Sequence, residues 1–459
     1  MAIIQNFTKN RYIFLVFWYN TYGCEIMKYY FIGIKGSGMS TLANILFDLG
    51  NDVVGYDDST GYKFTMYGLL ERGIEIYNGD DYPVLSSDTI VTYTAAINES
   101  HHEVKRVKEL GLKLVPYYEL MGDLTKNKES ICVCGTHGKT TTSLMIADIL
   151  DKSLGCSYFV GDGSGYGNKN SNLLVIESCE YNKHFLSYYP YNTVITNIEL
   201  DHTETYPTIK EMVDAYQVFV NKTSNSIIAC GDDVNIKTLT SDKKIYYYGF
   251  NETNDLVVKN KIVSNNKTCF DVYFKNEYFD HYEVGVFGNH MVLDMMASIM
   301  LSILYSVPRD IIKEVLEHFK PALRRFNESF VGDNVIVDDY AHHPTEIKVT
   351  YDAAHEKYPD KEIVAIFLPN TYSRTMDLFD DFKDALELYD KAYVMDISCD
   401  RERQEDYPEI NSSKLVDAIP NSELISLETV DKLKSHHNAV LCFMSCANIS
   451  KMIDKYKEL

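Results

Sequence analysis

A short run of residues after an apolar strand pattern contains the groups that grip the phosphates of a nucleotide. Its members are Gly135, Thr136, His137, Gly138, Lys139, Thr140 and Thr141. Glycines let the backbone approach an anion closely, a helix N-terminus binds it through N–H groups, and a lysine reaches the outer phosphates. The run follows a predicted buried strand, 130–134, and precedes a helical pattern. The sequence therefore predicts an ATP-binding loop, although Val133 stands where a full Walker A motif has its first glycine.

Residues of the types that bind metal ions follow two further predicted strands, 173–176 and 193–196. Glu177 comes directly after the first, and His202 lies six residues after the second. The carboxyl ends of parallel strands share one edge of a sheet, so these side chains are expected close to the Thr140 hydroxyl. Oxygen ligands and an imidazole beside a triphosphate suit Mg²⁺, with Mn²⁺ as the alternative. The ordinary alternatives are that Glu177 is a solvated surface acid and that His202 is a capping residue.

A second glycine-rich turn lies near the start of the chain, between an apolar strand at 29–33 and a helical pattern. Its helix-side residues are Gly36, Ser37, Gly38, Met39 and Ser40, and the next strand ends at Asp57. Such a turn opens a βαβ unit and binds diphosphates, but the glycine pattern does not fix which one. A dehydrogenase with Asp57 on a ribose remains open from these residues alone.

The last third of the chain has arginines and histidines in three short polar segments. Arg325, Tyr340, His343 and Arg374 are the residues of interest. Arginine forks suit a transferring phosphate or a substrate carboxylate. Surface ion pairs and a helix cap at Asp338 explain the same spacing equally well.

Length and composition narrow the class of protein. A chain of 459 residues predicts about three domains. The formal charge of −22 argues against nucleic-acid binding, because no basic face is available to replace counterions. Ten cysteines without CxxC pairs favour a reduced, cytoplasmic protein. The apolar run Tyr12 to Tyr19 is far shorter than the ~20 residues that span a bilayer, so no membrane insertion is expected.

The order of predicted elements gives an α/β fold of three domains. Residues 1–26 are assigned to an N-terminal extension, 27–127 to a Rossmann-like domain, 128–320 to a central P-loop ATPase-type domain, and 321–459 to a second Rossmann-like domain. The polar stretch Thr125 to Glu129 is predicted to be a linker. Residues 245–287 alternate aromatic and polar positions, which predicts an antiparallel sheet appended to the central domain.

Taken together, these segments resemble the Mur ligase family from Met27 to near the C-terminus. The likeness rests on GIKGSGMS, GTHGKTTT, GDGSGYG, ESCEYNKHFLSYYP, TNIELDH, RRFNE, DDYAHHPTEI and YSRT, in that order. GTHGKTTT is also found in the related folylpolyglutamate synthases. DDYAHHPTEI with the acidic CEY segment is similar to the branch of the family that adds alanine.

The resemblance implies a reaction and its substrates. It implies an ATP-dependent amide ligase of peptidoglycan precursor synthesis that joins L-alanine to the lactyl carboxylate of UDP-N-acetylmuramate through an acyl phosphate. ATP and Mg²⁺ are the implied cofactors. The expected protein is cytoplasmic, and a monomer or weak homodimer.

The resemblance also implies a role for each matched residue. Gly36 to Ser40 would hold the UDP diphosphate, and Asp57 would lie near the uridine. Thr140 and Glu177 would bind one Mg²⁺ and His202 a second. The ATP contacts would be the 135–141 loop, His290 and Arg325. Asp339, Tyr340, His343 and Arg374 would line the muramyl and alanine pocket, and the implied catalytic residues are Lys139, Arg325, His343 and Arg374.

Three departures from the family pattern leave alternatives open. Met291 and Asp294 stand where relatives often have asparagines near the adenine, Asn370 stands where they usually have histidine, and Ser445-Cys446-Ala447 replaces a glycine-rich turn. Asp294 is expected to remove a hydrogen-bond donor. A related ligase that adds a different amino acid or a peptide, and a non-catalytic sugar-nucleotide sensor, are the competing hypotheses.

Overall fold

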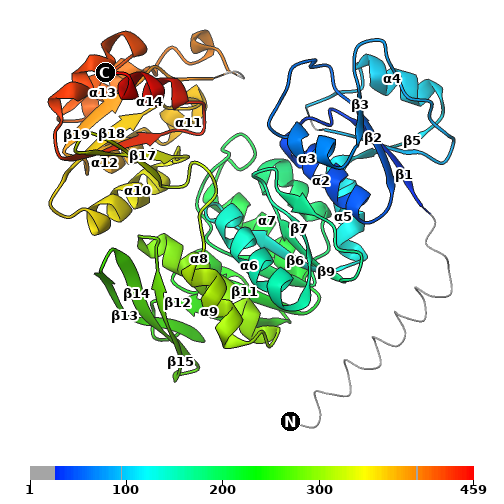
Figure 1. Cartoon of the computed structure of the whole chain (residues 1–459), viewed down its shortest axis with the longest axis horizontal. Coiled ribbons are helices and arrows are strands. Elements are labelled where there is room, and N and C mark those ends of the chain that lie inside the picture. The colour runs from blue at the N-terminus through cyan, green and yellow to red at the C-terminus, as the bar shows by residue number, and fades with distance from the viewer. Residues whose placement is uncertain (1–25, 95, 400–401) are drawn as a thin grey trace. The chain divides into compact units, whose positions relative to one another are not determined.

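The computed structural model of the chain describes residues 26–94, 96–399 and 402–459 (Figure 1). They form two compact units: the first holds the chain up to Met121 together with Gly163–Asn170, and the second holds Gly122–Asp162 and Ser171–Leu459. The predicted extension, residues 1–26, lies outside the described residues apart from Ile26. Among the helices of the described ranges, none has the length and apolar content needed to cross a membrane.

The first unit is a parallel sheet of five strands in the order β3-β2-β1-β4-β5. Its strands are β1 (Lys28–Ile32), β2 (Asp52–Tyr56), β3 (Glu75–Tyr77), β4 (Ile90–Tyr93) and β5 (Lys113–Pro116). Its helices are α2 (Ser37–Asp48), α3 (Met66–Glu71) and α4 (His102–Glu109), and the short strand β8 (Gly165–Tyr166) packs on α2. The strand order reverses at β1, which is where ligands bind in open α/β sheets.

Helix α5 (Tyr117–Lys126) follows β5 and leads directly to β6 (Glu129–Cys134). The predicted linker at Thr125 to Glu129 is therefore wrong at both ends: the helix includes Thr125 and Lys126, and Glu129 already pairs in the sheet. Polar composition indicated a loop, but Thr125 is buried and its hydroxyl donates to the Gly122 carbonyl, so the helix is held by contacts that composition does not report.

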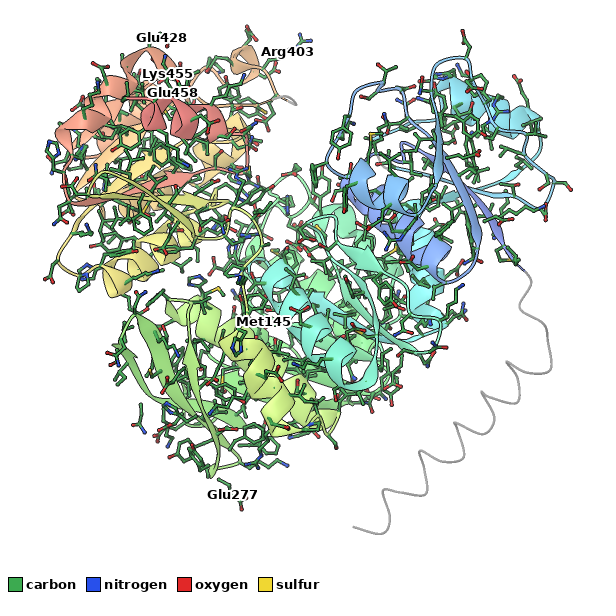
Figure 2. All side chains as sticks on the ribbon, in the orientation of Figure 1. Met145, Glu277, Arg403, Glu428, Lys455 and Glu458 are labelled. Atoms are coloured by element: carbon green, nitrogen blue, oxygen red, sulfur yellow. The ribbon has the colours of Figure 1, made fainter. Side chains whose placement is uncertain are left out.

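The second unit begins with a large sheet in which β6 lies between β9 (Leu173–Glu177) and β10 (Asn192–Ile195). The parallel strands β7 (Ser157–Phe159), β11 (Ser226–Cys230) and β12 (Lys244–Gly249) extend it on either side. Helices α6 (Lys139–Leu154), α7 (Ile209–Asn221), α8 (Asn289–Leu304) and α9 (Arg309–Glu317) accompany these strands, with 3₁₀ turns at Tyr181–Ser187 and Ile236–Thr238. α6 packs on α8 and α9 (Figure 1), and Met145 of α6, labelled in Figure 2, is fully buried.

An antiparallel extension continues this sheet, as the sequence predicts for part of 245–287. Strands β13 (Leu256–Ser264), β14 (Lys267–Phe274) and β15 (Glu277–Val284) pair antiparallel. Glu277, labelled in Figure 2, begins the outermost strand. The prediction is wrong for 244–249, because β12 pairs in parallel with both β11 and β13. Its tyrosines alternate in sequence, but the partner strand decides the direction of pairing.

A third sheet closes the chain, in the order β16-β17-β21-β18-β19-β20. Its strands are β16 (Asn327–Val331), β17 (Asn334–Asp339), β18 (Glu362–Phe367), β19 (Lys391–Val394), β20 (Ser422–Leu424) and β21 (Ala439–Met444). Its helices are α10 (Pro344–Lys357), α11 (Tyr372–Asp377), α12 (Phe379–Leu386), α13 (Ser412–Ala418) and α14 (Ser450–Lys457), with 3₁₀ turns at Gln404–Asp406 and Leu427–Ser435. All pairs except β16–β17 are parallel, and successive residues of β17 and β21 pack into two separate cores on the two faces.

Candidate active site

The loop 135–138 leaves β6 and passes directly beneath the start of α6, where two glycines are sterically required. Gly135 has φ +141°, and a Cβ there would lie 2.0 Å from Thr196 Oγ1. Gly138 has φ +78°, and a Cβ there would lie 2.4 Å from Asp294 Oδ1. Any other residue would be strained at these angles and would collide with its neighbours. Packing against Thr196 and Asp294 therefore requires glycine at both positions, and their close approach to a phosphate stays a prediction.

Asn197, just after β10, clamps the loop. Its Oδ1 accepts from His137 N at 2.9 Å, its Nδ2 donates to the His137 carbonyl at 3.0 Å, and its own carbonyl accepts from Thr136 N at 3.1 Å. The Thr136 hydroxyl donates to the Glu199 carbonyl at 3.0 Å. The conformation of the loop therefore depends on the neighbouring strand end as well as on its glycines.

Lys139, the first residue of α6, is folded back onto its own loop. Its Nζ donates to the carbonyls of Gly135 and Thr136, at 2.6 and 3.0 Å, and lies 3.0 Å from Glu180 Oε2. Burial lowers the pKa of Lys139, but Glu180, Cys179 and Glu177 together outweigh it and raise the pKa above the usual value. A charged lysine is thus kept in a site from which water is largely excluded, with Glu180 as its counter-ion.

The predicted metal ligands Thr140 and Glu177 lie together. The Thr140 hydroxyl donates to both Glu177 oxygens, at 3.1 and 3.0 Å, and Gly161 N donates to Glu177 Oε2 at 2.6 Å. Burial raises the pKa of Glu177. A buried carboxylate beside a hydroxyl is a donor set of hard oxygens, which fits Mg²⁺, and a cation there would favour the ionised carboxylate.

His202 lies near Glu180 instead of near the Thr140–Glu177 pair. Its Nε2 is 4.0 Å from Glu180 Oε1 and 3.8 Å from Asp201 Oδ2, and its φ is +52°. Glu180 therefore stands between Lys139 and His202. The assignment of His202 to a second metal stays a prediction.

A cavity of about 550 Å³ opens beside the phosphate loop. It is lined by the loop, by α8 and by the segment before β16, and the residues used below are His137, Gly138, His290, Asp294 and Arg325. Its size is that of a typical small-molecule site. His290 Nδ1 is buried at its wall and has no hydrogen-bond partner among the described residues. An unpartnered buried ring nitrogen fits a pocket that awaits a polar ligand, and burial lowers the pKa of His290 to about 4, so the ring is neutral at pH 7.

Asp294, one of the departures from the family pattern, packs under the phosphate loop. Its Oδ1 accepts from the Thr142 hydroxyl at 3.0 Å, and burial raises its pKa to about 8. The carboxyl is therefore largely protonated at pH 7 and keeps an O–H donor. Burial thus favours the neutral acid, which can donate, and the effect of Asp294 on the adenine contacts stays a prediction. Met291, the other departure on α8, is buried at the wall of the cavity.

Arg325 enters the cavity from a kinked segment. Arg324 and Phe326 on either side have φ of +61° and +54°, and Asp339 Oδ2 accepts from Phe326 N at 2.8 Å. Burial raises the pKa of Asp339 to about 6. The Arg325 guanidinium lies 5.1 Å from the ring centroid of Tyr340, which gives the half-exposed tyrosine a cation–π partner.

His137 joins the phosphate loop to α10. Its Nδ1 lies 3.1 Å from Glu346 Oε1, and its Nε2 lies 3.4 Å from Glu199 Oε2. Burial lowers the pKa of His137, but Glu199 and Glu346 outweigh it and raise the pKa to about 9. The imidazolium is thus held between two carboxylates that belong to different parts of the unit.

His343, predicted to be catalytic, caps α10 in this structure. Its Nδ1 accepts from Thr345 N at 3.3 Å, so its Nε2 carries the proton and donates to the Leu200 carbonyl at 3.3 Å. Burial, together with the nearby charge of His137, lowers the pKa of His343 to about 4.

Arg374 binds Asp201 Oδ1 through Nη2 at 3.1 Å. Substrate roles for His343 and Arg374 stay predictions, since their polar atoms are engaged within the protein.

In the first unit, the glycine-rich turn after β1 is also held by hydrogen bonds within the protein. Lys35 N donates to Asp57 Oδ2 at 2.9 Å, and Ser59 N donates to Oδ1 at 3.1 Å, so Asp57 fixes the turn by accepting backbone hydrogens. Ser40 donates its N–H to the Gly36 carbonyl and its hydroxyl to the Ser37 carbonyl. The diphosphate contacts of Met39 and Ser40 stay predictions, and Met39 is buried in α2. Gly36 to Gly38 remain at the helix N-terminus, where anions bind.

Three models of one family match successive stretches of the chain. "Mur ligase family, catalytic domain" matches residues 28–129, "Mur ligase middle domain" matches 133–302, and "Mur ligase, glutamate ligase domain" matches 324–444. The chain belongs to the Mur ligase family. Mur ligases use ATP, and the matched middle domain contains the phosphate loop described above.

Solved Mur-type ligases share this fold across nearly the whole chain. The UDP-N-acetylmuramate–alanine ligase of Thermotoga maritima is 24% identical, with a TM-score of 0.74 over 94% of this chain and 98% of that one. A murein peptide ligase of Psychrobacter arcticus is 20% identical, with a TM-score of 0.64 over 94% and 99%. A pseudomurein peptide ligase of Methanothermus fervidus is 17% identical, with a TM-score of 0.67 over 94% and 99%. These likenesses establish a shared fold.

The ligase site includes residues that sequence reasoning missed. Four further residues bind a cation or fix the loop, namely Glu180, Asn197, Glu199 and Glu346. All four lie inside the segments that carry the family likeness. Their signal was an acid or amide just beyond a strand end or in the first turn of a helix. Nothing in the spacing tells which neighbour such a side chain will bind.

We expect Asn197→Ala to weaken ADP binding roughly 30-fold, because the variant loses two hydrogen bonds that fix the loop and each contributes about 1 kcal/mol. Isothermal titration calorimetry with ADP measures this. Asn225→Ala is the matched control, since the Asn225 amide binds Asn192 away from the loop. Equal affinities of the two variants would show that the clamp does not shape the nucleotide site.

The raised pKa of His137 predicts a pH dependence of stability. A group whose pKa rises on folding stabilises the protein fully below its unfolded pKa, and this contribution is lost as pH rises through the folded value. The difference in melting temperature between the wild type and His137→Gln should therefore shrink between pH about 6.5 and 9. Differential scanning calorimetry of both proteins tests this, with the exposed His318→Gln as control. A difference that is constant over this range contradicts the assignment.

Proposed function

We propose that this Mur ligase joins L-alanine to the lactyl carboxylate of UDP-N-acetylmuramate with hydrolysis of ATP to ADP and phosphate. The observation that carries the proposal is the phosphate loop with its buried lysine, placed next to the Thr140–Glu177 oxygen pair in a chain that the Mur models match in three successive stretches between residues 28 and 444. The reaction would belong to peptidoglycan precursor synthesis in the cytoplasm.

The first step transfers the γ-phosphoryl group of ATP to the lactyl carboxylate and gives an acyl phosphate and ADP. Both reactants are anions, so the protein contributes mainly position and positive charge. Lys139 on the phosphate loop and Arg325 in the wall of the cavity would supply that charge. The oxygens of Thr140 and Glu177 would hold Mg²⁺, which supplies further neutralisation of the phosphates.

Lys139 must exchange partners for this step. In the ligand-free arrangement its ammonium is satisfied by two loop carbonyls and Glu180. Phosphate oxygens are stronger acceptors than carbonyls, and the lysine stem is flexible, so binding ATP replaces these contacts at little cost. Glu180 remains close enough to keep the lysine protonated.

In the second step the amino group of alanine attacks the acyl carbon, phosphate leaves, and the nitrogen loses a proton to give the amide. Exclusion of water protects the acyl phosphate during this step. Asp339, Tyr340 and Arg374 are the groups that we assign to this part of the substrate. Asp201 holds Arg374 in the ligand-free arrangement and would release it to a substrate carboxylate.

Alanine as the amine is supported by the segment 338–346, which is similar to the alanine-adding branch of the family. The competing substrate is a peptide, because murein peptide ligases share the same fold. The two differ in the amine that the pocket admits, and the fold does not separate them.

Purified protein with UDP-N-acetylmuramate, ATP and Mg²⁺ should release phosphate when L-alanine is added and not when a tripeptide replaces it. Phosphate is measured by a coupled spectroscopic assay, and mass spectrometry identifies the UDP-linked product. Release with the tripeptide and none with alanine would overturn the choice of amine while leaving the ligase class intact.

Lys139→Ala should lower phosphate release by at least about a hundredfold, because a charge that neutralises the transferring group is lost. Lys152→Ala is the matched control: it lies at the other end of α6, exposed, with Glu314 as its partner. A sugar-nucleotide sensor without catalysis would instead bind UDP-N-acetylmuramate and show no turnover in either protein.

A further inference from the structure

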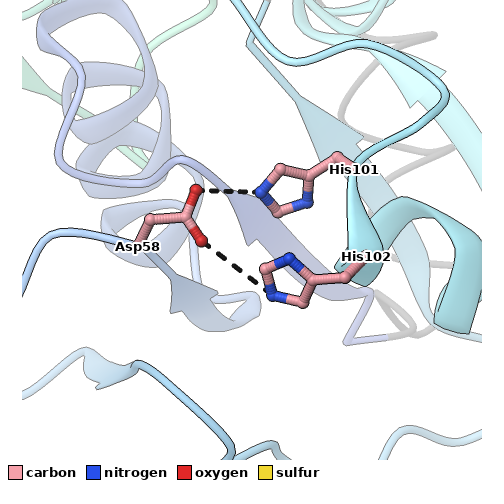
Figure 3. A group of neighbouring side chains, drawn as sticks. All are labelled: Asp58, His101 and His102. Atoms are coloured by element: carbon pink, nitrogen blue, oxygen red, sulfur yellow. Dashed lines mark hydrogen bonds and ion pairs between the residues drawn. The ribbon is translucent and has the colours of Figure 1, made fainter.

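Two histidines and an aspartate of the first unit converge where the proposed ligase reaction gives them no role. Asp58 follows β2, and His101 and His102 stand at the start of α4. His101 Nε2 lies 2.9 Å from Asp58 Oδ2, and His102 Nε2 lies 3.9 Å from Asp58 Oδ1. Figure 3 shows both imidazoles facing the two oxygens of one carboxylate.

The helix that carries the two imidazoles is fixed to the sheet. Glu103, the next residue of α4, is fully buried and accepts from the Tyr30 hydroxyl at 2.6 Å. Arg106 donates to the same carboxylate through Nε and Nη2, at 2.8 and 2.6 Å. This buried network holds the first turn of α4 against β1, so the two histidines are presented from a rigid element, as a binding site requires.

One protonated imidazole would pair with Asp58 without repulsion, but two imidazoles approach the same carboxylate. Their centroids lie 4.4 Å apart, so two protonated rings would repel each other across that gap. A metal cation between the three groups would let both imidazoles and the carboxylate bind at once without that repulsion.

We propose that Asp58, His101 and His102 form a binding site for a divalent transition-metal ion of the zinc class. The three ligand atoms all lie within 4.8 Å of one another. Tetrahedral Zn²⁺ with bonds near 2.0–2.1 Å holds its ligand atoms about 3.3 Å apart, so the three atoms must draw together by up to about 1.5 Å to complete the site. Two imidazoles and one carboxylate leave further positions for water, and this donor set distinguishes the ion from the Mg²⁺ expected at Thr140 and Glu177.

Metal binding requires a change of tautomer at His101 and the loss of one helix-cap hydrogen bond. In the ligand-free arrangement His101 Nδ1 accepts from Glu103 N at 3.2 Å, so its Nε2 carries the hydrogen directed at Asp58. A metal on Nε2 needs that lone pair, which moves the proton to Nδ1 and gives up the cap bond. His102 Nε2 is 3.0 Å from the Tyr56 hydroxyl, which can donate to the Gly79 carbonyl instead. Both changes are local and leave the backbone in place.

The test is Zn²⁺ binding to the untagged, chelator-treated full chain, measured by competition with a chromophoric chelator. The wild type should bind one more Zn²⁺ than His102→Gln or Asp58→Asn, or bind it at least about tenfold more tightly. His102 and Asp58 are half-exposed or more, so both variants are expected to fold. Comparison between variants also cancels Zn²⁺ held by cysteines, since Cys179 is exposed.

His281→Gln is the matched control. His281 also faces an aspartate, with Nδ1 2.7 Å from Asp271 Oδ1, but it is outside the three-residue cluster. It should bind Zn²⁺ like the wild type. A second readout is the melting temperature, which Zn²⁺ should raise in the wild type and in His281→Gln but not in the two site variants. Identical stoichiometry, affinity and melting shift in all four proteins would overturn the proposal, and none of these readouts depends on ligase activity.

Discussion

The close contact between the phosphate loop and its neighbours is the constraint on which the rest of the candidate site depends. Gly135 rests against Thr196, and Gly138 rests against Asp294, at distances that leave no room for a Cβ. Because β6 lies between β9 and β10, the ends of these strands place Glu177 on one side of the loop and Asn197 on the other. The carboxylate, the clamp and the lysine therefore converge because three parallel strands end at one edge.

Charge around this loop is balanced within the protein. Lys139 pairs with Glu180, His137 with Glu199 and Glu346, and Arg374 with Asp201. These cations are largely withdrawn from water, so each needs a carboxylate when no phosphate is present. Anionic substrates then replace existing partners instead of filling a bare positive site. The same pairs link the phosphate loop and the strand ends to α10 and α11, which couples nucleotide contacts to the last third of the chain.

In the first unit, the adjacent residues Asp57 and Asp58 after β2 bind different partners. Asp57 accepts backbone hydrogens and shapes the glycine turn, while Asp58, one residue later, faces away to two histidines. Adjacent residues after a strand point in different directions, so one crossover can serve both a diphosphate turn and a cation site.

The sequence by itself determined the α/β fold, because apolar periodicity is a local property, and it identified the family through the resemblance of its motifs. It also brought Thr140 and Glu177 together correctly, since both follow from the shared edge of parallel strands. The tertiary structure decided the rest. The pairing direction of β12, the helix over Thr125, and the partners of Lys139, His137 and Arg374 depend on residues far away in the chain. The neutral acid at Asp294 depends on burial, which the residue type does not reveal.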